Sequence, residues 1–346
     1  MAQICMIRSW IESLTGGDKL SLIPTILLLL VGLVLIIKGG DWFVDSAAWI
    51  AEVSGIPKLI VGATVVSFAT TLPELLVSSF ATAEGNISTS IGNAVGSVTA
   101  NIGLIMAIGL IFMSGKIKKK DYLLKSVLML LGGVLLFLLT MSGKLRVVPS
   151  LILILVFAVF MFDNVRRAVI EHKLEKARSA EDRHVISGKK EVIVNVLKFI
   201  GGVAGIVIGA DLLSDNGVAL ASQLGVPERI VAVTVIAIGT SLPELVTMIT
   251  AIVKKQHELS FGNIIGANVI DIALILPVCA AISKGGVLVA KDMSSILIDI
   301  PLMVVCGLVA LVPMLITGKF HRWQGFVLLG IYLTYILLMC FGVIAV

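Results

Sequence analysis

Six stretches of this chain contain no Asp, Glu, Lys or Arg, a seventh contains only one such residue, Asp271, and each is long enough, or nearly so, to cross a lipid bilayer as a helix. Of the 346 residues, 58% are hydrophobic and only 14% are charged, a balance that cannot be folded around an aqueous surface. A β-barrel would instead show short segments of alternating polarity. The sequence therefore predicts an all-α integral membrane protein. The six charge-free stretches are residues 20–37, 86–115, 126–143, 147–162, 300–318 and 323–346, and the stretch that contains only Asp271 is residues 259–283.

Two further apolar runs, residues 42–83 and 192–253, are interrupted by Gly, Pro and single carboxylates. We interpret them as broken helices followed by further spans. The expected total is then ten transmembrane helices, with breaks in helices 2 and 7. The expected spans are residues 21–38, 43–83, 88–112, 122–141, 147–165, 193–212, 214–253, 259–282, 294–315 and 324–345.

The chain is internally duplicated. A displacement of 170 residues places residues 62–74 on residues 232–244 without a gap, and 25 of the 80 pairs between residues 31–110 and 201–280 are identical. Each half then has five helices, and an odd number forces the second half to enter the membrane from the opposite side, as in the inverted repeats of many secondary transporters. The expected division is an N-terminal segment at 1–20, a first five-helix repeat at 21–165, a cytoplasmic linker at 166–192 and a second five-helix repeat at 193–346.

The distribution of basic residues predicts the orientation. With the N-terminus outside, the inward connections contain 18 Lys and Arg residues, including Lys38 and the lysines of residues 116–125, and the outward segments contain six. The positive-inside rule therefore places both termini outside and the linker in the cytoplasm, in a plasma (inner) membrane. We expect the linker to form at most a short surface helix and to contact membrane lipids. The net charge of +5 follows from this excess, so no nucleic-acid partner is expected.

The first repeat carries a polar face inside an apolar run. On a helix, Ser67, Thr70, Thr71 and Glu74 are spaced i, i+3, i+4 and i+7, which places three hydroxyls and one carboxylate along one side. Pro73 lacks a backbone N–H and so frees carbonyl groups about one turn earlier. The hydroxyls have an alternative role, because Ser and Thr in membrane helices often only bond to a carbonyl one turn back.

The second repeat carries the same pattern at Thr240, Ser241 and Glu244, with Ala237 in the place of the first serine and Pro243 beside the glutamate. The two glutamates supply two negative charges, which match one divalent ion. Hydroxyl, carbonyl and carboxylate oxygens are the hard ligands that suit Ca²⁺ and Na⁺. Since no Lys or Arg is close in sequence, a bound cation or a proton is the expected partner of each carboxylate.

The third span of each half adds a further layer. Ser97 and Asn101 lie on one helical face, and the duplication places Ala267 and Asp271 in the same positions. A third carboxylate can bind a cation, accept a proton or hold a ligand water, and the sequence leaves these roles open. The G-x-x-x-G pairs of these spans, at residues 92–96 and 262–266, predict close helix packing.

These segments resemble the two α-repeats of the sodium/calcium exchangers, a family of the calcium/cation antiporter superfamily. The family pattern is G-[ST]-[ST]-x-P-E followed by G-N-x-x-G-[ST]-x-x-x-N/D. It is matched by residues 69–74 with 92–101 and by residues 239–244 with 262–271, and the resemblance covers essentially the whole chain. The chain departs from the pattern at Ala69, in place of Gly, at Ser67, where Ala is common, and at Ala267, in place of a hydroxyl residue.

The resemblance implies ten helices, with Ca²⁺ and Na⁺ alternating at midplane sites formed by the second, third, seventh and eighth. It implies that Glu74 and Glu244 are direct Ca²⁺ ligands and share Na⁺ ligation with the nearby hydroxyls. Asn101 and Asp271 would complete the central layer, and backbone carbonyls would contribute in both repeats. The implied ligand residues are Glu74, Glu244, Thr70, Thr71, Ser97, Asn101, Thr240, Ser241, Asp271, Ser67 and Ala237.

We therefore expect a secondary-active antiporter, and not an enzyme, that exchanges Na⁺ for Ca²⁺ by alternating access and extrudes Ca²⁺ with the Na⁺ gradient. No cofactor is expected besides the transported ions, and a monomer suffices. An H⁺-coupled or K⁺-dependent Ca²⁺/cation antiporter is the alternative, because Asp271 is compatible with either ion. A gated cation channel ranks lower, since paired helix breakers in inverted halves favour a carrier. No nucleophile–base pair or His/Cys metal triad favours an enzyme.

Overall fold

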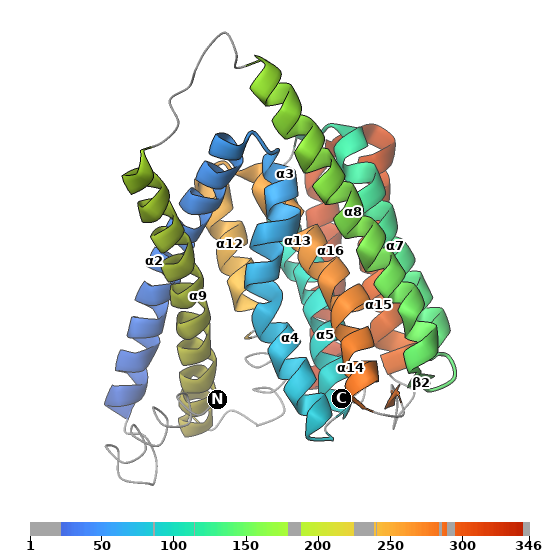
Figure 1. Cartoon of the computed structure of the whole chain (residues 1–346). Helices are drawn as coiled ribbons and strands as arrows, with labels where there is room; N and C mark the ends of the chain where they lie inside the picture. Colours follow the sequence, from blue (N-terminus) through green and yellow to red (C-terminus); the bar gives the residue numbers. More distant parts are fainter. Residues whose placement is uncertain are drawn as a thin grey trace.

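The computed structural model describes residues 22–85, 87–113, 115–178, 188–224, 239, 241–283, 286–288 and 295–341. In these residues the chain forms a bundle of long helices whose axes are roughly aligned (Figure 1). Nine of the described helical segments are long and apolar enough to cross a membrane, and the shorter apolar helix α12 accompanies them. The helices are α2 (Leu22–Ser54), α3 (Lys58–Val61), the π-helix η1 (Gly62–Val66), α4 (Ser67–Ala83), α5 (Ile87–Ala100), η2 (Asn101–Met106), α6 (Ala107–Phe112), α7 (Lys119–Thr140), α8 (Val147–Arg178), α9 (Lys189–Gln223), α12 (Leu242–Val253), α13 (His257–Ile270), η4 (Asp271–Ile275), α14 (Leu276–Ile282), η5 (Ser295–Asp299), α15 (Ile300–Thr317) and α16 (Arg322–Cys340).

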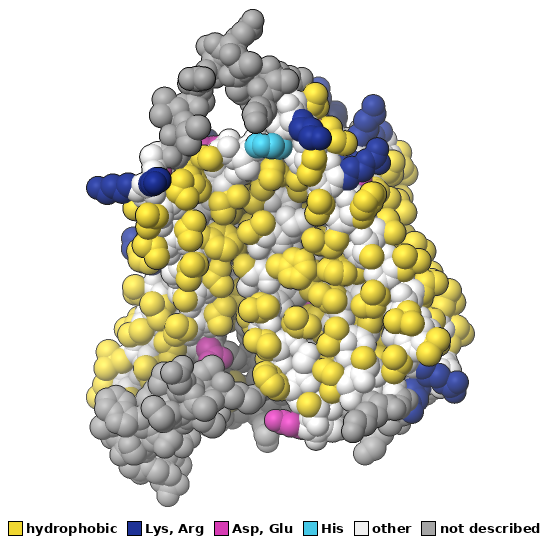
Figure 2. Space-filling view, in the orientation of Figure 1, with side chains coloured by type: hydrophobic (Ala, Val, Ile, Leu, Met, Phe, Trp, Pro, Cys, Tyr) yellow, Lys and Arg dark blue, Asp and Glu magenta, His cyan; other side chains and the backbone are white. Residues whose placement is uncertain are grey.

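The outer surface of the bundle is apolar. Figure 2 shows hydrophobic side chains over most of one face, with Lys and Arg side chains gathered at its upper end and at the lower right edge. Large aliphatic side chains such as Leu155, Leu197 and Leu337 are more than half exposed, at 60%, 62% and 55%. An apolar surface of this extent is stable against lipid and not against water. The prediction of an all-α, multi-pass membrane protein is confirmed.

Glycines allow α2 and α9 to pack along each other (Figure 1). A Cβ built on Gly39 would lie 2.8 Å from the backbone N of Ile206, and one built on Gly209 would lie 2.7 Å from the carbonyl O of Gly32. Real Cβ atoms do not approach backbone atoms so closely, so the two helices can meet only where the side chain is absent.

This packing corrects the expected boundary between the first two spans. The sequence predicted that the first span ends at Lys38 and that the second begins after the pair Gly39 and Gly40. The structure instead continues α2 without interruption to Ser54, because the glycines serve contact with neighbouring helices and do not break the helix. The interruption lies at Gly55, whose φ of 64° is left-handed. Lys38 consequently lies inside α2 and not in a connection.

The second membrane-spanning segment runs from Lys58 to Ala83 through α3, η1 and α4. The predicted break near Pro73 is absent, because Pro73 is accommodated inside α4, and the irregular part is the π-helical turn that precedes it. The corresponding proline, Pro243, lies in the first turn of α12, but of the two residues before it where the break is expected, 239 and 240, only Gly239 is described, so the predicted break in helix 7 lies outside the described residues.

The segment α13–η4–α14 forms the centre of the bundle, and 83% of the residues in its 18-residue apolar stretch are buried. It crosses the second span at two glycines. A Cβ on Gly62 would lie 2.1 Å from the carbonyl O of Leu259, and a Cβ on Gly262 would lie 2.3 Å from the carbonyl O of Leu59. The predicted close packing is confirmed for residues 262–266, and Gly92 and Gly96 make no such contact with the described residues.

Two short antiparallel ribbons join connections of the two halves. Strand β1 (Gly115–Lys116) pairs with β4 (Lys319–Phe320), and β2 (Lys144–Leu145) pairs with β3 (Val287–Leu288). Since β1 precedes α7 and β2 follows it, the ribbons lie at opposite ends of that helix.

Both ends of the expected linker are helical. Residues 166–178 continue α8, so the prediction of at most a short surface helix is wrong there, and residues 189–192 belong to α9. Residues 179–187 between them lie outside the described residues.

Candidate ion-binding site

Three carboxylates lie at the centre of the bundle, on three different segments. Glu74 on α4, Glu244 on α12 and Asp271 at the start of η4 are each only 1% exposed. Glu74 experiences electrostatic repulsion from both Glu244 and Asp271, so the three groups share one region. Because Glu74 is 170 or more positions away from Glu244 and Asp271 in sequence, the site exists only when both halves are folded.

Several oxygen atoms at this centre have no hydrogen-bond partner among the described residues. They are Oε2 of Glu74, Oε2 of Glu244, both carboxylate oxygens of Asp271, Oδ1 of Asn101 and Oγ of Ser241. Burying an ionised carboxylate without a partner costs roughly several kcal/mol or more. An ionised carboxylate therefore stays buried only where it can bind a counter-charge. Nδ2 of Asn263 also has no partner among these residues, but the other atoms are oxygens, and a cation is the ligand that carboxylate, amide and hydroxyl oxygens would bind together.

Hydrogen bonds across the site connect the two halves. The hydroxyl of Thr71 donates to Oε1 of Glu244 at 3.3 Å, and the hydroxyl of Thr70 donates to Oδ1 of Asn263 at 3.2 Å. One layer away, Nδ2 of Asn101 donates to Oδ1 of Asn268 at 3.1 Å. These bonds orient side chains of both halves, and Oε2 of each glutamate has no hydrogen-bond partner among the described residues.

The hydroxyl of Ser67 takes the role that the sequence left open for membrane serines. It donates to the carbonyl of Thr64 at 3.1 Å, one turn back on the same helix, and is fully buried. Its backbone carbonyl accepts a hydrogen bond from the hydroxyl of Thr70 at 3.4 Å. Ser97 is also buried, at 2% exposed.

The remaining predicted site residues fall into two groups, those that the structure describes and those that it does not. Seven described residues from four segments are buried together at the centre of the bundle, whereas Thr240 and Ala237 lie outside the described residues. No group of three or more His, Cys, Asp and Glu side chains close enough to hold one metal ion occurs in the described part of the chain. An ion here would therefore take many of its ligands from hydroxyl, amide and backbone oxygens. The seven are Thr70, Thr71, Glu74, Asn101, Ser241, Glu244 and Asp271.

Sequence reasoning did not assign a ligand-positioning role to Asn263 or Asn268. Both are buried on α13, at 1% and 0% exposed, and each accepts a hydrogen bond from the first half of the chain. A signal was present, because amides inside an apolar membrane-spanning stretch must find partners in the membrane. What the sequence did not contain was the crossing of α13 with the second span, which brings the partners within reach.

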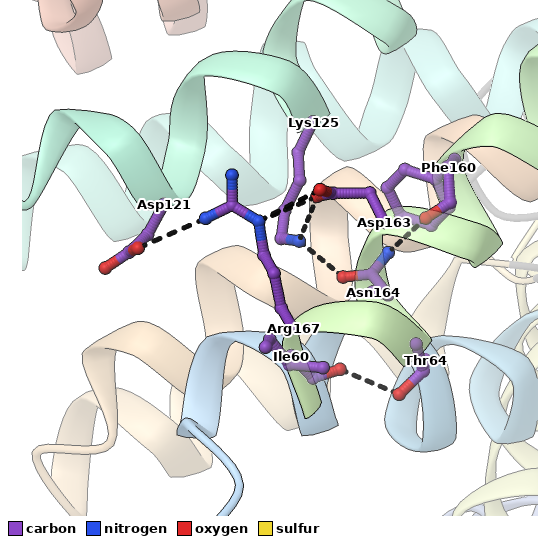
Figure 3. A network of polar contacts seen from close by, with 8 residues as sticks. All are labelled: Ile60, Thr64, Asp121, Lys125, Phe160, Asp163, Asn164 and Arg167. Atoms are coloured by element: carbon purple, nitrogen blue, oxygen red, sulfur yellow. Dashed lines mark hydrogen bonds and ion pairs between the residues drawn. The ribbon is translucent and has the colours of Figure 1, made fainter. Parts of the chain in front are cut away.

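A second polar cluster connects α7 to α8 (Figure 3). Lys125, only 1% exposed, donates a short hydrogen bond to Oδ1 of Asn164 and lies 3.8 Å from a carboxylate oxygen of Asp163. Arg167 binds Asp163 at 2.9 Å and Asp121 at 3.3 Å. Two cations thus face two carboxylates, so the cluster is balanced and provides no spare positive charge for the central acids.

This cluster corrects the prediction that Lys125 belongs to an inward connection, since it lies inside the helix α7. One turn further along α7, the sulfur of Met129 lies 3.6 Å from Nδ2 of Asn268, the residue that contacts Asn101. The cluster therefore fixes a helix whose next turn supports the ion site.

A bundle of apolar helices whose described residues bury carboxylate, amide and hydroxyl oxygens without a hydrogen-bond partner fits a membrane transporter of cations. The comparison with known families agrees with this class: the family model described as "Sodium/calcium exchanger protein" matches residues 24–164 and again residues 194–341. The chain belongs to the sodium/calcium exchanger family. The two matches coincide with the two halves found by internal duplication.

Named relatives cover nearly the same length. The chain is 28% identical to the sodium/calcium exchanger MaX1 of Methanosarcina acetivorans over 90% of this chain and 97% of that protein. It is 31% identical to the inner membrane protein YrbG of Escherichia coli over 75% and 80% of the two chains. The solved structure of the sodium-calcium exchanger NCX_Mj, soaked with Na⁺ and Sr²⁺, superposes with a TM-score of 0.77 at 26% identity and covers 92% of this chain and 99% of its own. The fold of that exchanger is therefore the fold of this chain.

Proposed function

We propose that this protein is a secondary-active antiporter that exchanges Na⁺ for Ca²⁺ across the membrane by alternating access, and that it extrudes Ca²⁺ with the Na⁺ gradient. The observation that carries the proposal is the set of buried oxygens of Glu74, Glu244 and Asp271 that have no partner among the described residues. Support comes from the sodium/calcium exchanger MaX1 and from the exchanger NCX_Mj, whose structures were obtained with Na⁺, Ca²⁺ or Sr²⁺.

The ion site is proposed to use the full set of residues named from the sequence. Glu74 and Glu244 would bind Ca²⁺ directly, and the hydroxyls beside them would join in binding Na⁺. Asp271 and Asn101 would form the adjoining layer. The proposed set is Glu74, Glu244, Thr70, Thr71, Ser97, Asn101, Thr240, Ser241, Asp271, Ser67 and Ala237.

Exchange follows from competition for the same carboxylates. Na⁺ and Ca²⁺ cannot occupy Glu74 and Glu244 together, because two carboxylates neutralise either one divalent ion or two monovalent ions. A conformational change that requires a neutralised centre would then carry one ion species in each direction. The cost of an empty, charged centre in the membrane opposes any uncoupled return.

The proposed topology is two inverted repeats of five helices with both termini outside and the linker in the cytoplasm. The ribbons support inversion, because β1 and β3 occupy equivalent connections of the two repeats and yet lie at opposite ends of α7. The basic side chains at the upper end, where α8 ends and α9 begins, support a cytoplasmic assignment of that end (Figure 2). The relative YrbG is named an inner membrane protein, which supports that location.

Coupling to H⁺ or K⁺ is the second candidate. Both oxygens of Asp271 lack a partner among the described residues, and this acid has an asparagine as its counterpart in the first repeat. A carboxylate in that position can take a proton or help to hold a larger monovalent ion.

The proposal is tested by ⁴⁵Ca²⁺ uptake into proteoliposomes loaded with Na⁺, with K⁺ or with an acidic buffer. We expect uptake with the outward Na⁺ gradient and its loss in Glu74→Gln and Glu244→Gln. Glu258→Gln, which changes an exposed carboxylate on α13, is the matched control and should keep native uptake. Uptake driven equally by a pH or K⁺ gradient without Na⁺ would move the assignment to the second candidate. Uptake that needs no counter-ion would contradict an antiporter.

A further inference from the structure

Two kinds of contact hold α2 in the molecule, and they differ in how easily α2 can slide past the neighbouring helix. Against α9, the contact is between backbones, because a Cβ on Gly202 would lie 2.7 Å from the backbone N of Phe43. Against α12, the neighbours of Gly40 are side chains, those of Val246 and Thr250. Interlocked backbones keep α2 and α9 together, whereas side-chain contacts can be exchanged for others. The pair α2–α9 is thus the part of the fold best suited to move against the helices that carry the ion site.

One ion-pair cluster connects α2 to the carboxyl end of α12. Nζ of Lys254 lies 2.7 Å from Oδ1 of Asp45 and 3.3 Å from Oδ1 of Asp41, and it donates to the carbonyl O of Asp41 at 3.0 Å. The lysine side chain is 23% exposed, so the contact is partly shielded from solvent. At the same end of α2, Nδ1 of His172 on α8 lies 2.6 Å from the carbonyl O of Ser54.

The duplication allows a comparison with the opposite end of the molecule. A shift of 170 residues relates Asp41 and Asp45 to Asp211 and Asp215, so both mobile helices carry the same two acids. It relates Lys254 to Glu84, and the charge at that position is therefore reversed.

The backbone supports this equivalence. Lys254 ends α12 and Glu84 ends α4, each as the C-terminal cap of its helix. The residues that follow, Lys255 and Gly85, both have positive φ, at 57° and 86°. The two turns are built alike, and only one of them presents a cation. A carboxylate at Glu84 cannot pair with Asp211 and Asp215, and it would repel them if the helices approached.

We propose that Lys254 is a positioning residue that stabilises one of the two transport conformations, the one in which α2 lies against the end of α12, and that Glu84, at the equivalent turn, cannot form the same ion pair in the other. The inference rests on the proposed function, because it assigns a role to Lys254 within alternating access. A carrier built from two similar halves would have two conformations of similar energy, and an ion pair that Glu84 cannot reproduce makes them unequal. The predicted consequence is a resting population biased to one side.

The test measures the conformational populations directly. Spin labels are attached at Leu27→Cys on α2 and Val148→Cys on α8, which are 56% and 76% exposed, after Cys5 and Cys340 are changed to Ser. Electron–electron distance distributions are recorded for the full chain in lipid nanodiscs without Ca²⁺. The buried Cys279 and Cys306 remain unlabelled.

We expect two distances between the labels in the native background, a dominant one and a minor one. Lys254→Glu should raise the population of the minor distance relative to the dominant one by about three- to tenfold, as for partly exposed ion pairs. The charge swap of Lys254→Asp with Asp45→Lys should restore the native ratio. Lys255→Asn, which removes the neighbouring charge and tolerates positive φ, should leave it unchanged. Glu84→Lys should also raise the population of the minor distance, because it places a cation at the other turn.

An unchanged distribution in Lys254→Glu would overturn the proposal, and so would a charge swap that resembles Lys254→Glu instead of the native protein. Asp45→Asn, which leaves the lysine in place, provides a milder version should Lys254→Glu not fold, with a smaller shift in the same direction expected. The distances are independent of the transported ion. A native protein without Na⁺-driven uptake would therefore refute the proposed function while the population measurement still decides the role of Lys254.

Discussion

Replacement of Lys125 by Met tests how the buried cluster of Figure 3 stabilises the bundle. The substitution removes a hydrogen bond from a charged donor and leaves Oδ1 of Asn164 buried without it. Hydrogen bonds to charged groups contribute about 1.5–3 kcal/mol, and an unsatisfied buried acceptor costs about 1–3 kcal/mol. Removal of the buried ammonium recovers part of this, so we expect a loss of about 2 kcal/mol in the free energy of unfolding. Asp163 keeps its ion pair with Arg167.

The double variant Lys125→Met with Asn164→Leu separates this cause from a general defect. Removal of both polar partners eliminates the orphaned acceptor, so the double variant should recover at least half of the loss, with a coupling of about 1 kcal/mol. Unfolding is followed by intrinsic fluorescence during titration with SDS in mixed micelles. The control is Lys120→Met, an exposed lysine on the same helix, whose effect should stay within about 0.5 kcal/mol. A double variant that is less stable than Lys125→Met would refute this reasoning.

Two further predictions concern the crossing of the second span with α13. Gly62→Ala would place a Cβ 2.1 Å from a backbone oxygen, so it should destabilise the protein by about 1–3 kcal/mol or prevent its folding, whereas Gly330→Ala, with no atom within 4 Å, should be neutral or stabilising. Thermal unfolding in detergent compares the two, and equal midpoints would contradict the crossing. Asn268→Leu removes the partner of Asn101 and should weaken Ca²⁺ binding by about tenfold, as for one lost hydrogen bond, while the fold is retained. Isothermal titration with Ca²⁺ measures this, and unchanged affinity would show that Asn101 needs no support.

Charge-free length located most of the spans, because a bilayer crossing requires it. The spans from residue 119 to 140 and from 322 to 340 lie within three residues of expectation at their start and within five at their end. The boundary after Lys38 was wrong because a pair of glycines can have either of two structural roles. It can interrupt a helix, or it can allow a neighbouring helix to pack closely. Which one applies is decided by α9, more than 150 residues away in sequence.

The candidate site was predicted from repetition of chemistry, and the buried positions of Glu74, Glu244 and Asp271 agree with a common centre. The parts that sequence could not supply depend on tertiary distance. Lys125 was assigned to a connection because a lysine near a span is usually solvated, and only the carboxylate and amide on α8 explain its burial.

The crossed pairing of the ribbons has a consequence for biosynthesis. Strands β1 and β2 both belong to the first half of the chain, and each finds its partner only in β4 or β3 of the second half. While the ribosome is still adding the second half, the inserted first half holds two unpaired strands, an unfilled glycine groove on α2 and an acid with no ligand. The newly made first half therefore stays incomplete in the membrane until β4 has been made and pairs with β1. A chain truncated before Lys319 would leave the edge of β1 unpaired, and such an open edge favours association with other chains.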